Sequence, residues 1–291
     1  MYDIEEIFEA TSPVHAVQLL QEHKDAEIIA GGSDVLIKIR EGKLAGCSLV
    51  SIQKLNELRG VTLEEDGSVR IGPLTSFSHL ARDPIILKYI PVLSEAVLNI
   101  GGPQIRNIGT VGGNICNGVT SADSASTLLA YDAELEYLGP NGKRVVPIRQ
   151  HYVAAGKTAL EHEEILTAII INKDSYENCF GCYIKYAMRG ALDIATLGCS
   201  ANVRLSSKNI GRLRLAYGVA GPVPMRAVSA EREAVYNTAS AETLDKVIKA
   251  LLKDINPRTS WRASREFRIH LAQELARRTI TQSLHRAGVS I

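Results

Sequence analysis

Glycine is unusually dense in one part of the sequence. Five glycines occur within the 14 residues from 101 to 114, GGPQIRNIGTVGGN. Each glycine weakens a helix or a strand by about 0.5 to 1 kcal/mol relative to alanine, so we expect irregular backbone here. Glycine also lets the backbone approach a ligand closely and adopt positive φ, so that successive amide N–H groups can point at one anion. The segment is therefore predicted to cradle a phosphate.

A second, shorter glycine loop precedes a helix-like segment. Residues 31–34, GGSD, follow an apolar strand predicted at residues 27–30 and open a predicted helix. Free N–H groups and the dipole at a helix N-terminus favour negative charge. Hydrogen bonds to a charged group contribute about 1.5 to 3 kcal/mol each, more than a screened surface lysine. An ordinary turn explains either loop alone, but the two together predict a clamp around one pyrophosphate.

The pattern of apolar residues predicts an α+β fold that begins with a small parallel sheet. The first element is expected to be a helix, because Ser12 can cap it and Pro13 suits its first turn. Two strands, at residues 27–30 and 47–52, are joined through a helix and therefore run parallel. This first subdomain is predicted to cover residues 1–55.

The second subdomain, residues 56–176, is predicted to contain a larger mixed or antiparallel sheet. Gly139-Pro-Asn-Gly142 is typical of a hairpin turn. Strands are expected at residues 68–71, 133–138, 144–148 and 164–171, and helices at residues 76–81 and 91–99. The two subdomains together form a predicted domain of residues 1–176.

The remainder, residues 177–291, is predicted to form a C-terminal domain with an antiparallel sheet and a helical cluster. Its strands are expected at residues 181–186, 195–205 and 213–219, and its two long helices begin after the caps Ser240 and Ser264. Residues 256–291 contain seven arginines and two glutamates. This charge predicts either a docking face for an acidic partner or an ordinary solvated helix face.

Composition and motifs argue against several classes of function. The 33 Lys and Arg residues balance 32 Asp and Glu residues, so nucleic acid is not an expected partner. The longest apolar run, residues 165–171, is too short to span a membrane, so no membrane association is expected. The odd number of cysteines, five, and the acidic N-terminal segment MYDIEEIFEATSP predict reduced thiols in the cytoplasm. P-loop, Rossmann, serine hydrolase and zinc-helix motifs are missing, and the lone pair Cys179 and Cys182 is expected to bind no metal.

Three segments resemble a known family. They are AGGSDVL at 30–36, IGGPQIRNIGTVGGNICNGVTSADSA at 100–125 and YIKYAMRGALDIATLGCS at 183–200. They are similar to the FAD-binding subunits of bacterial xanthine dehydrogenases, within the molybdenum hydroxylase family. The resemblance extends along nearly the whole chain and implies an FAD domain of two subdomains followed by a C-terminal domain of sheet and helices.

The resemblance assigns the two glycine loops to the two sides of the FAD pyrophosphate. On one side it implies contacts from Ile28, Ile29, Ala30, Gly31, Gly32, Ser33, Asp34 and Val35. On the other side it implies contacts from Thr110, Val111, Gly112, Gly113 and Asn114. The reasoning from glycine content and the resemblance therefore indicate the same two segments.

Four further residues are implied to border the flavin. Asp123 would accept a hydrogen bond from a flavin-side hydroxyl, and Leu166 would border the cofactor. Lys185 would approach the edge of the isoalloxazine ring. Ile100 would pack on the ring at a position that is aromatic in some relatives. An aromatic face could come instead from one of two tyrosines, for which ordinary strand packing is the alternative: Tyr183 or Tyr186.

The segment after the third motif's tyrosines resembles a mobile loop that controls access to the flavin. Tyr186, Arg189 and Asp193 are therefore implied to form an access loop for NAD. The alternative is a plain strand connection with a surface salt bridge. Leu192 is apolar where several relatives have an acidic residue, so the electrostatic role of this loop does not carry over unchanged.

The resemblance also implies a function that depends on partner subunits. Electrons from a molybdopterin centre on one partner would cross two [2Fe-2S] clusters on an iron–sulfur partner, reduce FAD on this chain, and leave as hydride to NAD⁺ during hypoxanthine or xanthine oxidation. No side chain of this chain need act as nucleophile or base, and no metal is expected here. The alternatives are the flavin subunit of another molybdenum hydroxylase, a free-standing FAD-dependent reductase, or a non-catalytic nucleotide-binding module.

Overall fold

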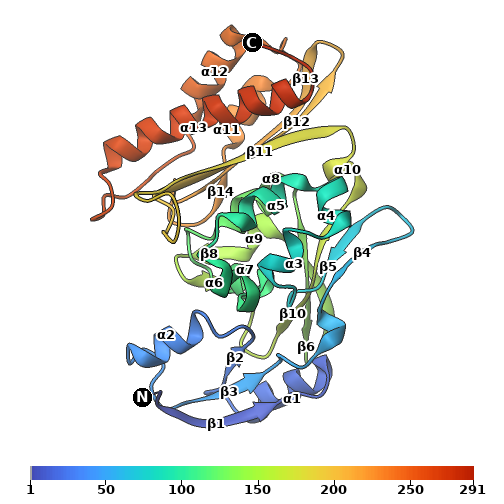
Figure 1. The fold of residues 1–291 in the computed structure, drawn as a ribbon, viewed down its shortest axis with the longest axis vertical. Coiled ribbons are helices and arrows are strands. Elements are labelled where there is room, and N and C mark those ends of the chain that lie inside the picture. Colours follow the sequence, from blue (N-terminus) through green and yellow to red (C-terminus); the bar gives the residue numbers. More distant parts are fainter. Residues whose placement is uncertain (1) are drawn as a thin grey trace.

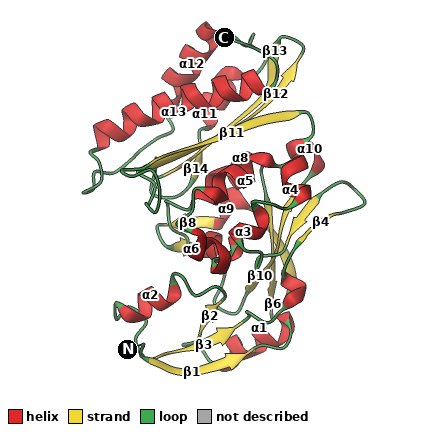
Figure 2. Cartoon of the chain, in the orientation of Figure 1, coloured by secondary structure: helices red, strands yellow, loops and turns green. Residues whose placement is uncertain are grey.

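Three sheets are stacked along the long axis of the molecule in the computed structural model, which describes residues 2–291 (Figure 1). A small sheet lies at the N-terminal end, and a five-stranded sheet with many short helices lies in the middle. A four-stranded sheet covered by helices lies at the other end (Figure 2). The predicted α+β fold is confirmed.

The N-terminal sheet is parallel, as predicted, with the strand order β1-β3-β2. Its elements are β1 (Ile4–Glu9), α1 (Pro13–Glu22), β2 (Glu27–Ile29), α2 (Val35–Arg40) and β3 (Cys47–Ser51). The expectation that the chain begins with a helix is wrong, because β1 precedes α1. Most side chains of β1 are exposed, so the sequence shows no buried face there, and pairing with β3 is what defines the strand.

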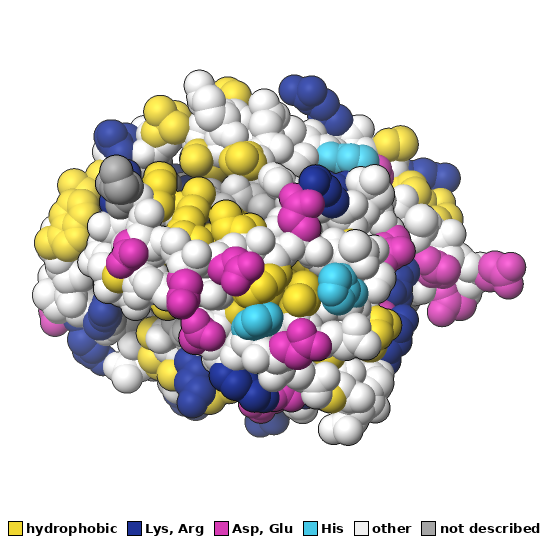
Figure 3. Space-filling view, turned by 90° about the horizontal axis from the view of Figure 1, so that it is seen from below, with side chains coloured by type: hydrophobic (Ala, Val, Ile, Leu, Met, Phe, Trp, Pro, Cys, Tyr) yellow, Lys and Arg dark blue, Asp and Glu magenta, His cyan; other side chains and the backbone are white. Residues whose placement is uncertain are grey.

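Helix α1 joins this sheet to the middle of the molecule. The hydroxyl of Ser12 accepts a hydrogen bond of 3.1 Å from the amide of His15, which confirms the predicted cap. The buried side of α1 packs towards β6 and β10, described below, and includes Val17 and Leu20. Seen from the end that carries the N-terminal sheet, the surface has acidic, basic and apolar side chains interspersed (Figure 3).

The middle sheet is antiparallel, with the order β4-β5-β10-β6-β7. Its strands are β4 (Val61–Leu63), β5 (Val69–Ile71), β6 (Glu134–Gly139), β7 (Gly142–Pro147) and β10 (Ile165–Ile171). The predicted hairpin joins β6 to β7, and Gly142 adopts a φ of 96° in its turn. Strand β10 lies at the centre and is buried along nearly its whole length.

Short helices and a small two-stranded sheet surround the middle sheet. They are η1 (Asn56–Leu58), α3 (Phe77–Leu80), α4 (Pro84–Tyr89), α5 (Pro91–Leu98), α6 (Pro103–Ile108), α7 (Val111–Cys116), α8 (Asp123–Ala130), α9 (Ile148–His151), β8 (Tyr152–Ala154) and β9 (Lys157–Thr158). The expectation of irregular backbone in the glycine-dense segment is wrong, because α6 and α7 form there. Pro103 suits the first turn of α6, and the Thr110 hydroxyl caps α7 by accepting from the amide of Gly113.

The C-terminal sheet is an antiparallel meander, as predicted, with the order β11-β12-β13-β14. Its elements, with the helix before it, are α10 (Lys173–Tyr176), β11 (Cys179–Tyr186), β12 (Leu197–Ser206), β13 (Asn209–Gly218), β14 (Met225–Arg226), α11 (Val228–Ala234), α12 (Ala241–Leu251) and α13 (Arg265–Arg286). The predicted caps Ser240 and Ser264 are confirmed. Helix α13 packs on β11 and β12, and α8 packs on β12 and β13 from the middle layer.

Hydropathy gives one further finding. Within residues 2–291, every helix is too short or too polar to cross a membrane.

Candidate cofactor-binding site

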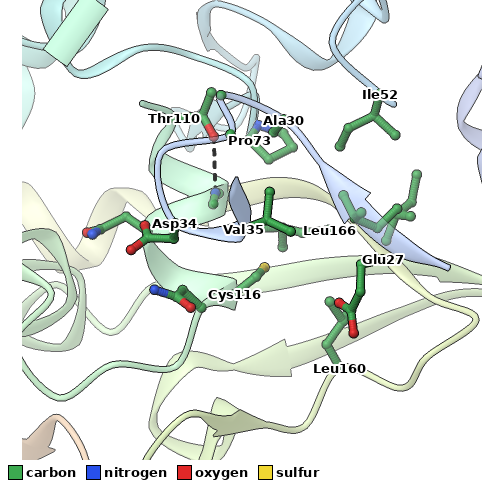
Figure 4. A pocket seen from close by; sticks show the side chains of 18 of the residues that line it. Glu27, Ala30, Asp34, Val35, Ile52, Pro73, Thr110, Cys116, Leu160 and Leu166 are labelled. Atoms are coloured by element: carbon green, nitrogen blue, oxygen red, sulfur yellow. Dashed lines mark hydrogen bonds between the residues drawn. The ribbon is translucent and has the colours of Figure 1, made fainter. Parts of the chain in front are cut away.

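A pocket of about 430 Å³ lies between the N-terminal sheet and the middle layer (Figure 4). This volume falls within the range of about 300 to 1,000 Å³ that is typical of small-molecule sites. The predicted site residues that line it are Ile28, Ala30, Gly31, Gly32, Ser33, Asp34, Val35, Ile100, Thr110, Gly112, Gly113, Asn114 and Leu166. The structure thus brings together most of both glycine loops. Ile29 and Val111 belong to the same segments but contribute no lining surface.

The two glycine loops contact each other directly. A β-carbon on residue 31 would overlap the carbonyl oxygen of Ile108 and lie 2.8 Å from its carbonyl carbon. Only glycine therefore permits this approach of the loop before α2 to the end of α6. Gly32 follows with a φ of 76°, a conformation that other residues rarely adopt. The two loops consequently form one continuous cradle.

The amide groups of the first loop are available to a ligand. Within residues 2–291, the backbone N–H groups of residues 31–34 donate no hydrogen bond to another protein atom. Buried or partly buried amides without partners are costly, so a ligand with several acceptor oxygens would satisfy them. A diphosphate has such oxygens, which means that this loop fits the pyrophosphate of a dinucleotide.

The amide groups of the second loop are already used, which differs from the expectation that both loops offer free donors. In the first turn of α7, the amide of Val111 donates to Thr75 and that of Gly112 donates to Pro73, at 3.0 and 2.8 Å. The amide of Gly113 donates to Thr110 at 3.1 Å, shown by the dashed line in Figure 4. The second loop therefore offers close backbone approach and the positive end of α7 rather than a row of free amides.

Polar side chains in the pocket complement the free amides. The side-chain oxygen of Asn114, Oδ1, accepts a hydrogen bond of 2.6 Å from the Ser124 hydroxyl. The side-chain NH₂ group of Asn114 is therefore left for the pocket. Burial raises the pKa of Asp34, while Lys38 and Asn117 oppose that rise. A carboxyl group in this position suits a ligand hydroxyl better than a phosphate, because phosphate would be repelled by the carboxylate.

Asp123, Tyr183 and Lys185 form a buried cluster beside the pocket. Asp123 accepts hydrogen bonds from the Tyr183 hydroxyl at 2.6 Å and from the Lys185 ammonium at 2.9 Å. The side chains of Asp123 and Lys185 are each only 7% exposed. Burial raises the pKa of Asp123, and the Lys185 ammonium opposes that rise. Lys185 also donates to the carbonyl of Asn99, so the cluster adjoins the Ile100 end of the pocket.

This arrangement differs from the separate contacts that the resemblance implied for Asp123 and Lys185. The two side chains bond to each other, and neither lines the pocket. The two tyrosines that remained alternatives also lie outside its lining. Tyr183 is buried with its hydroxyl bonded to Asp123, whereas the ring of Tyr186 packs edge-to-face on Phe267 at 5.9 Å.

The predicted access loop connects β11 to β12. Asp193 accepts hydrogen bonds from the amides of Met188 and Arg189 at 2.9 and 3.0 Å. The exposed Arg189 guanidinium lies 3.9 Å from the Asp193 carboxylate, whose side chain is 11% exposed, so the plain salt-bridge alternative describes this contact. Leu192 has a φ of 56°, and its side chain lies 2.6 Å from where a β-carbon on Gly102 would be. The loop therefore rests against the backbone next to Ile100.

Several lining residues were not predicted from the sequence. Pro73, Phe77, Leu160 and Asn117 all contribute to the wall of the pocket. Pro73, Phe77 and Leu160 lie outside the three motifs, whereas Asn117 lies within the second motif but was not singled out. Only the folded chain brings the four together. Cys116 also lines the pocket, and all five cysteines are free. Within residues 2–291, no group of three or more His, Cys, Asp or Glu side chains is arranged to hold a metal ion.

Comparison with known proteins agrees with the resemblance. The family model "FAD binding domain in molybdopterin dehydrogenase" matches residues 3–173, and "CO dehydrogenase flavoprotein C-terminal domain" matches residues 182–283. The xanthine dehydrogenase FAD-binding subunit of Escherichia coli O157:H7 is 45% identical over 288 residues, covering 99% of each chain. The carbon monoxide dehydrogenase medium chain of Hydrogenophaga pseudoflava is 28% identical, covering 94% of each chain.

Solved structures show the same architecture. A carbon monoxide dehydrogenase chain from Hydrogenophaga pseudoflava superposes with a TM-score of 0.94 at 27% identity, covering 98% of this chain and 99% of that chain. A chain of quinoline 2-oxidoreductase from Pseudomonas putida shares the fold, with a TM-score of 0.92 at 21% identity. The family predicted from the three sequence motifs is therefore confirmed. This chain belongs to the FAD-binding medium subunits of the xanthine dehydrogenase and molybdenum hydroxylase family.

Proposed function

We propose that this chain is the FAD-binding electron-transfer subunit of a cytoplasmic xanthine dehydrogenase complex. The observation that carries the proposal is the cradle formed where Gly31 meets Ile108, with free amides at residues 31–34 above a pocket of about 430 Å³. The relative at 45% identity is named a xanthine dehydrogenase FAD-binding subunit, which supports xanthine as the substrate of the complex. Five free cysteines support a reducing compartment.

The residues of the pocket fit the parts of FAD. The free amides of residues 31–34 would hold the pyrophosphate, and Thr110 to Asn114 would approach it from the other side. Ile100 and Leu166 offer apolar surface to the flavin ring. FAD, when bound, accepts electrons singly and passes a pair as hydride, so it supplies the redox chemistry. This chain contributes binding, orientation and electrostatics.

The buried cluster of Asp123, Tyr183 and Lys185 would set the electrostatics at one end of the site. Lys185 carries a positive charge next to Asn99 and Ile100, and Asp123 holds that charge in place. A fixed positive charge near the flavin stabilises negative charge that develops on the ring. Asp123 and Lys185 are thus proposed to act as a pair, with Asp123 positioning the lysine.

The access loop and the partners complete the proposal. Tyr186, Arg189 and Asp193 would govern the approach of NAD⁺ as electron acceptor. Partner subunits of the complex would carry the molybdopterin centre and the [2Fe-2S] clusters, because the relatives of this chain are named as a subunit or a medium chain.

We also propose residues 1–176 as the FAD-binding domain and residues 177–291 as the C-terminal domain. These bounds are close to the extents of the two family models.

The decisive experiment is purification of the native complex from its own cells. Flavin, iron and molybdenum are counted, and reduction of NAD⁺ is measured with xanthine as the electron donor. We expect one FAD per copy of this chain, co-purification with iron–sulfur and molybdenum chains, and xanthine-dependent NADH formation. A chain that purifies alone and cannot be reconstituted with FAD would refute the proposal. A loaded complex that reduces only oxygen would refute the assignment of NAD⁺.

A further inference from the structure

An exposed aromatic and basic surface lies just before and at the start of α13. It consists of Arg258, Trp261, Arg262, Arg265 and Phe267, and we call it the arginine–tryptophan surface. Trp261 is the single tryptophan of the chain, and 75% of it is exposed. The Arg262 guanidinium lies 4.2 Å from the centre of the indole ring. Exposure of such a large apolar side chain is costly in isolation, and Trp and Arg dominate the binding energy of protein interfaces.

The backbone of this surface is held firmly although it lies in a connection between helices. Ser260 and Ala263 exchange two backbone hydrogen bonds of 3.0 and 3.2 Å. The amide of Arg265 donates to the Thr259 hydroxyl at 3.0 Å. Trp261 is therefore presented on a preorganised turn, so its burial by a partner would cost little additional ordering.

Arg268 attaches this turn to the end of the access loop. Its side chain is only 2% exposed and donates to the carbonyl of Thr196 and to the hydroxyl of Ser260. Nearby, the ring of Phe267 packs on Tyr186, where the access loop begins. In Figure 1 the turn before α13 and the loop between β11 and β12 lie on the same side of the molecule. The surface is thus continuous with the loop that rests on Gly102 beside the pocket.

The surface carries an excess of positive charge, with four arginines and one carboxylate, that of Glu266, within residues 258–268. Within residues 2–291, no carboxylate lies within 4.0 Å of a guanidinium nitrogen of Arg258, Arg262, Arg265 or Arg268. Other arginines of the same helix are paired, such as Arg277 with Asp245 and Arg278 with Glu274. Burial and the charges of Arg258 and Arg262 lower the pKa of Arg268. A partner with acidic side chains would relieve this repulsion.

We propose that the arginine–tryptophan surface docks the iron–sulfur chain of the complex, and that this chain presents acidic side chains around an apolar pocket for Trp261. The inference rests on the proposed function, because it names the partner that delivers electrons to the site. Its basis is the combination of an exposed tryptophan, a fixed backbone, unpaired arginines and continuity with the edge of the pocket. The docked chain would lie next to the loop at the Ile100 end of the site.

The test measures binding of this chain, loaded with FAD, to the purified iron–sulfur chain of its own complex. Trp261→Ser removes the exposed ring, and Arg258→Glu with Arg265→Glu reverses two charges. Glutamate in the first turn of α13 suits the helix dipole, so the double variant is expected to fold. Matched controls are Arg232→Glu on α11 and Tyr236→Asn, where asparagine tolerates the left-handed φ of 67°.

We expect Trp261→Ser to weaken binding at least about tenfold. The double charge reversal should slow association at low salt by at least about tenfold, with a smaller effect at high salt. Both controls should bind within about twofold of the unaltered chain. Bound FAD per chain and the melting temperature report that the variants fold.

Two outcomes would overturn the inference. In the first, Trp261→Ser and the double charge reversal bind the iron–sulfur chain with the same affinity and association rate as the unaltered chain. The second is a dimer of this chain alone, detected by sedimentation, that Trp261→Ser dissociates, because a second copy would then be the occupant. Failure of the unaltered chain to bind FAD would refute the proposed function instead, so the two failures are distinguishable.

Discussion

The backbone of Gly31 packs against the carbonyl group of Ile108 without room for a side chain between them. This contact joins two loops that lie far apart in the sequence and fixes the shape of the cradle above the pocket. It also explains why glycine is needed at a position where its backbone conformation alone does not require it, since Gly31, unlike Gly32, has no positive φ. The first prediction follows from this contact.

Gly31→Ala should separate the two loops. The new methyl group would overlap backbone atoms that cannot rotate away, at an expected cost of about 1 to 3 kcal/mol in the free energy of unfolding. We expect FAD affinity to fall at least about tenfold, measured by fluorescence titration of the FAD-free chain. Gly142→Ala is the control, because Gly142 has positive φ but open space around it. It should lose stability and keep its FAD affinity; equal affinity in both variants would contradict the prediction.

Lys185→Met should be strongly destabilising on its own. It would leave the Asp123 carboxyl group buried without its cation, for which losses of about 3 to 5 kcal/mol are typical. Adding Asp123→Asn should recover part of this loss, as measured by urea unfolding of both variants. In the FAD-loaded chain, Lys185→Met should also lower the flavin reduction potential, because a positive charge near the ring is lost. A double variant no more stable than the single one would argue against the pairing.

His151 should make the protein less stable in acid. It is fully buried, and its Nε2–H donates to the carbonyl of Ile115 in α7 while its Nδ1 accepts from the Tyr137 hydroxyl. Burial lowers the pKa of His151 to about 4 from 6.5, although the bond to Ile115 opposes this. In the unfolded chain the His151 imidazole binds a proton below about pH 6.5, whereas in the folded chain it does so only near pH 4. The free energy of unfolding should therefore fall by about 3 kcal/mol as the pH drops through this window.

Denaturant unfolding between pH 7 and pH 4 measures this effect. His151→Gln should flatten that part of the pH profile, because glutamine does not titrate. His270→Gln, at an exposed position on α13, should leave the profile of the unaltered chain in place. Parallel profiles for His151→Gln and the unaltered chain would contradict the assignment to His151.

Leu192→Asp should weaken the use of NAD⁺ by the intact complex. The side chain is exposed on the access loop next to Gly102, and aspartate is more compatible than leucine with its left-handed φ, so the fold should persist. A new negative charge there would repel the dinucleotide phosphates, raising KM for NAD⁺ a few-fold at low salt and less at high salt. Leu252→Asp, at the exposed residue that follows the last turn of α12, should leave KM unchanged. An unaltered KM in Leu192→Asp would place the NAD⁺ path elsewhere.

Local signals in the sequence predict local structure well in this chain. The caps at Ser12, Ser240 and Ser264 and the turn at residues 139–142 depend only on neighbouring residues, and each forms as expected. The two glycine-rich loops do line the pocket, and their predicted contact with a pyrophosphate stays a prediction. Their internal structure was not predicted correctly, because a proline at the start of α6 and a threonine cap at α7 outweigh the low helix propensity of glycine.

Long-range contacts explain what the sequence could not reveal. Strand β1 forms because β3 pairs with it, although its own side chains are mostly exposed. Asp123 and Lys185 are 62 positions apart, and nothing near either residue indicates that they bond to each other. Similarly, the amides of α7 are occupied by carbonyls of Thr75 and Pro73, which lie in a preceding segment. Such partners become visible only when the chain has folded.

The place of β10 at the centre of the middle sheet has a consequence for biosynthesis. This strand is inserted between β5 and β6, both of which are made earlier, and Leu166 within it supplies part of the pocket wall. A growing polypeptide that has not yet released residues 165–171 from the ribosome therefore lacks the central strand of this sheet and the part of the pocket wall that Leu166 supplies. We therefore expect cofactor loading to follow insertion of β10, so that the yellow colour of bound flavin would report a completed middle sheet.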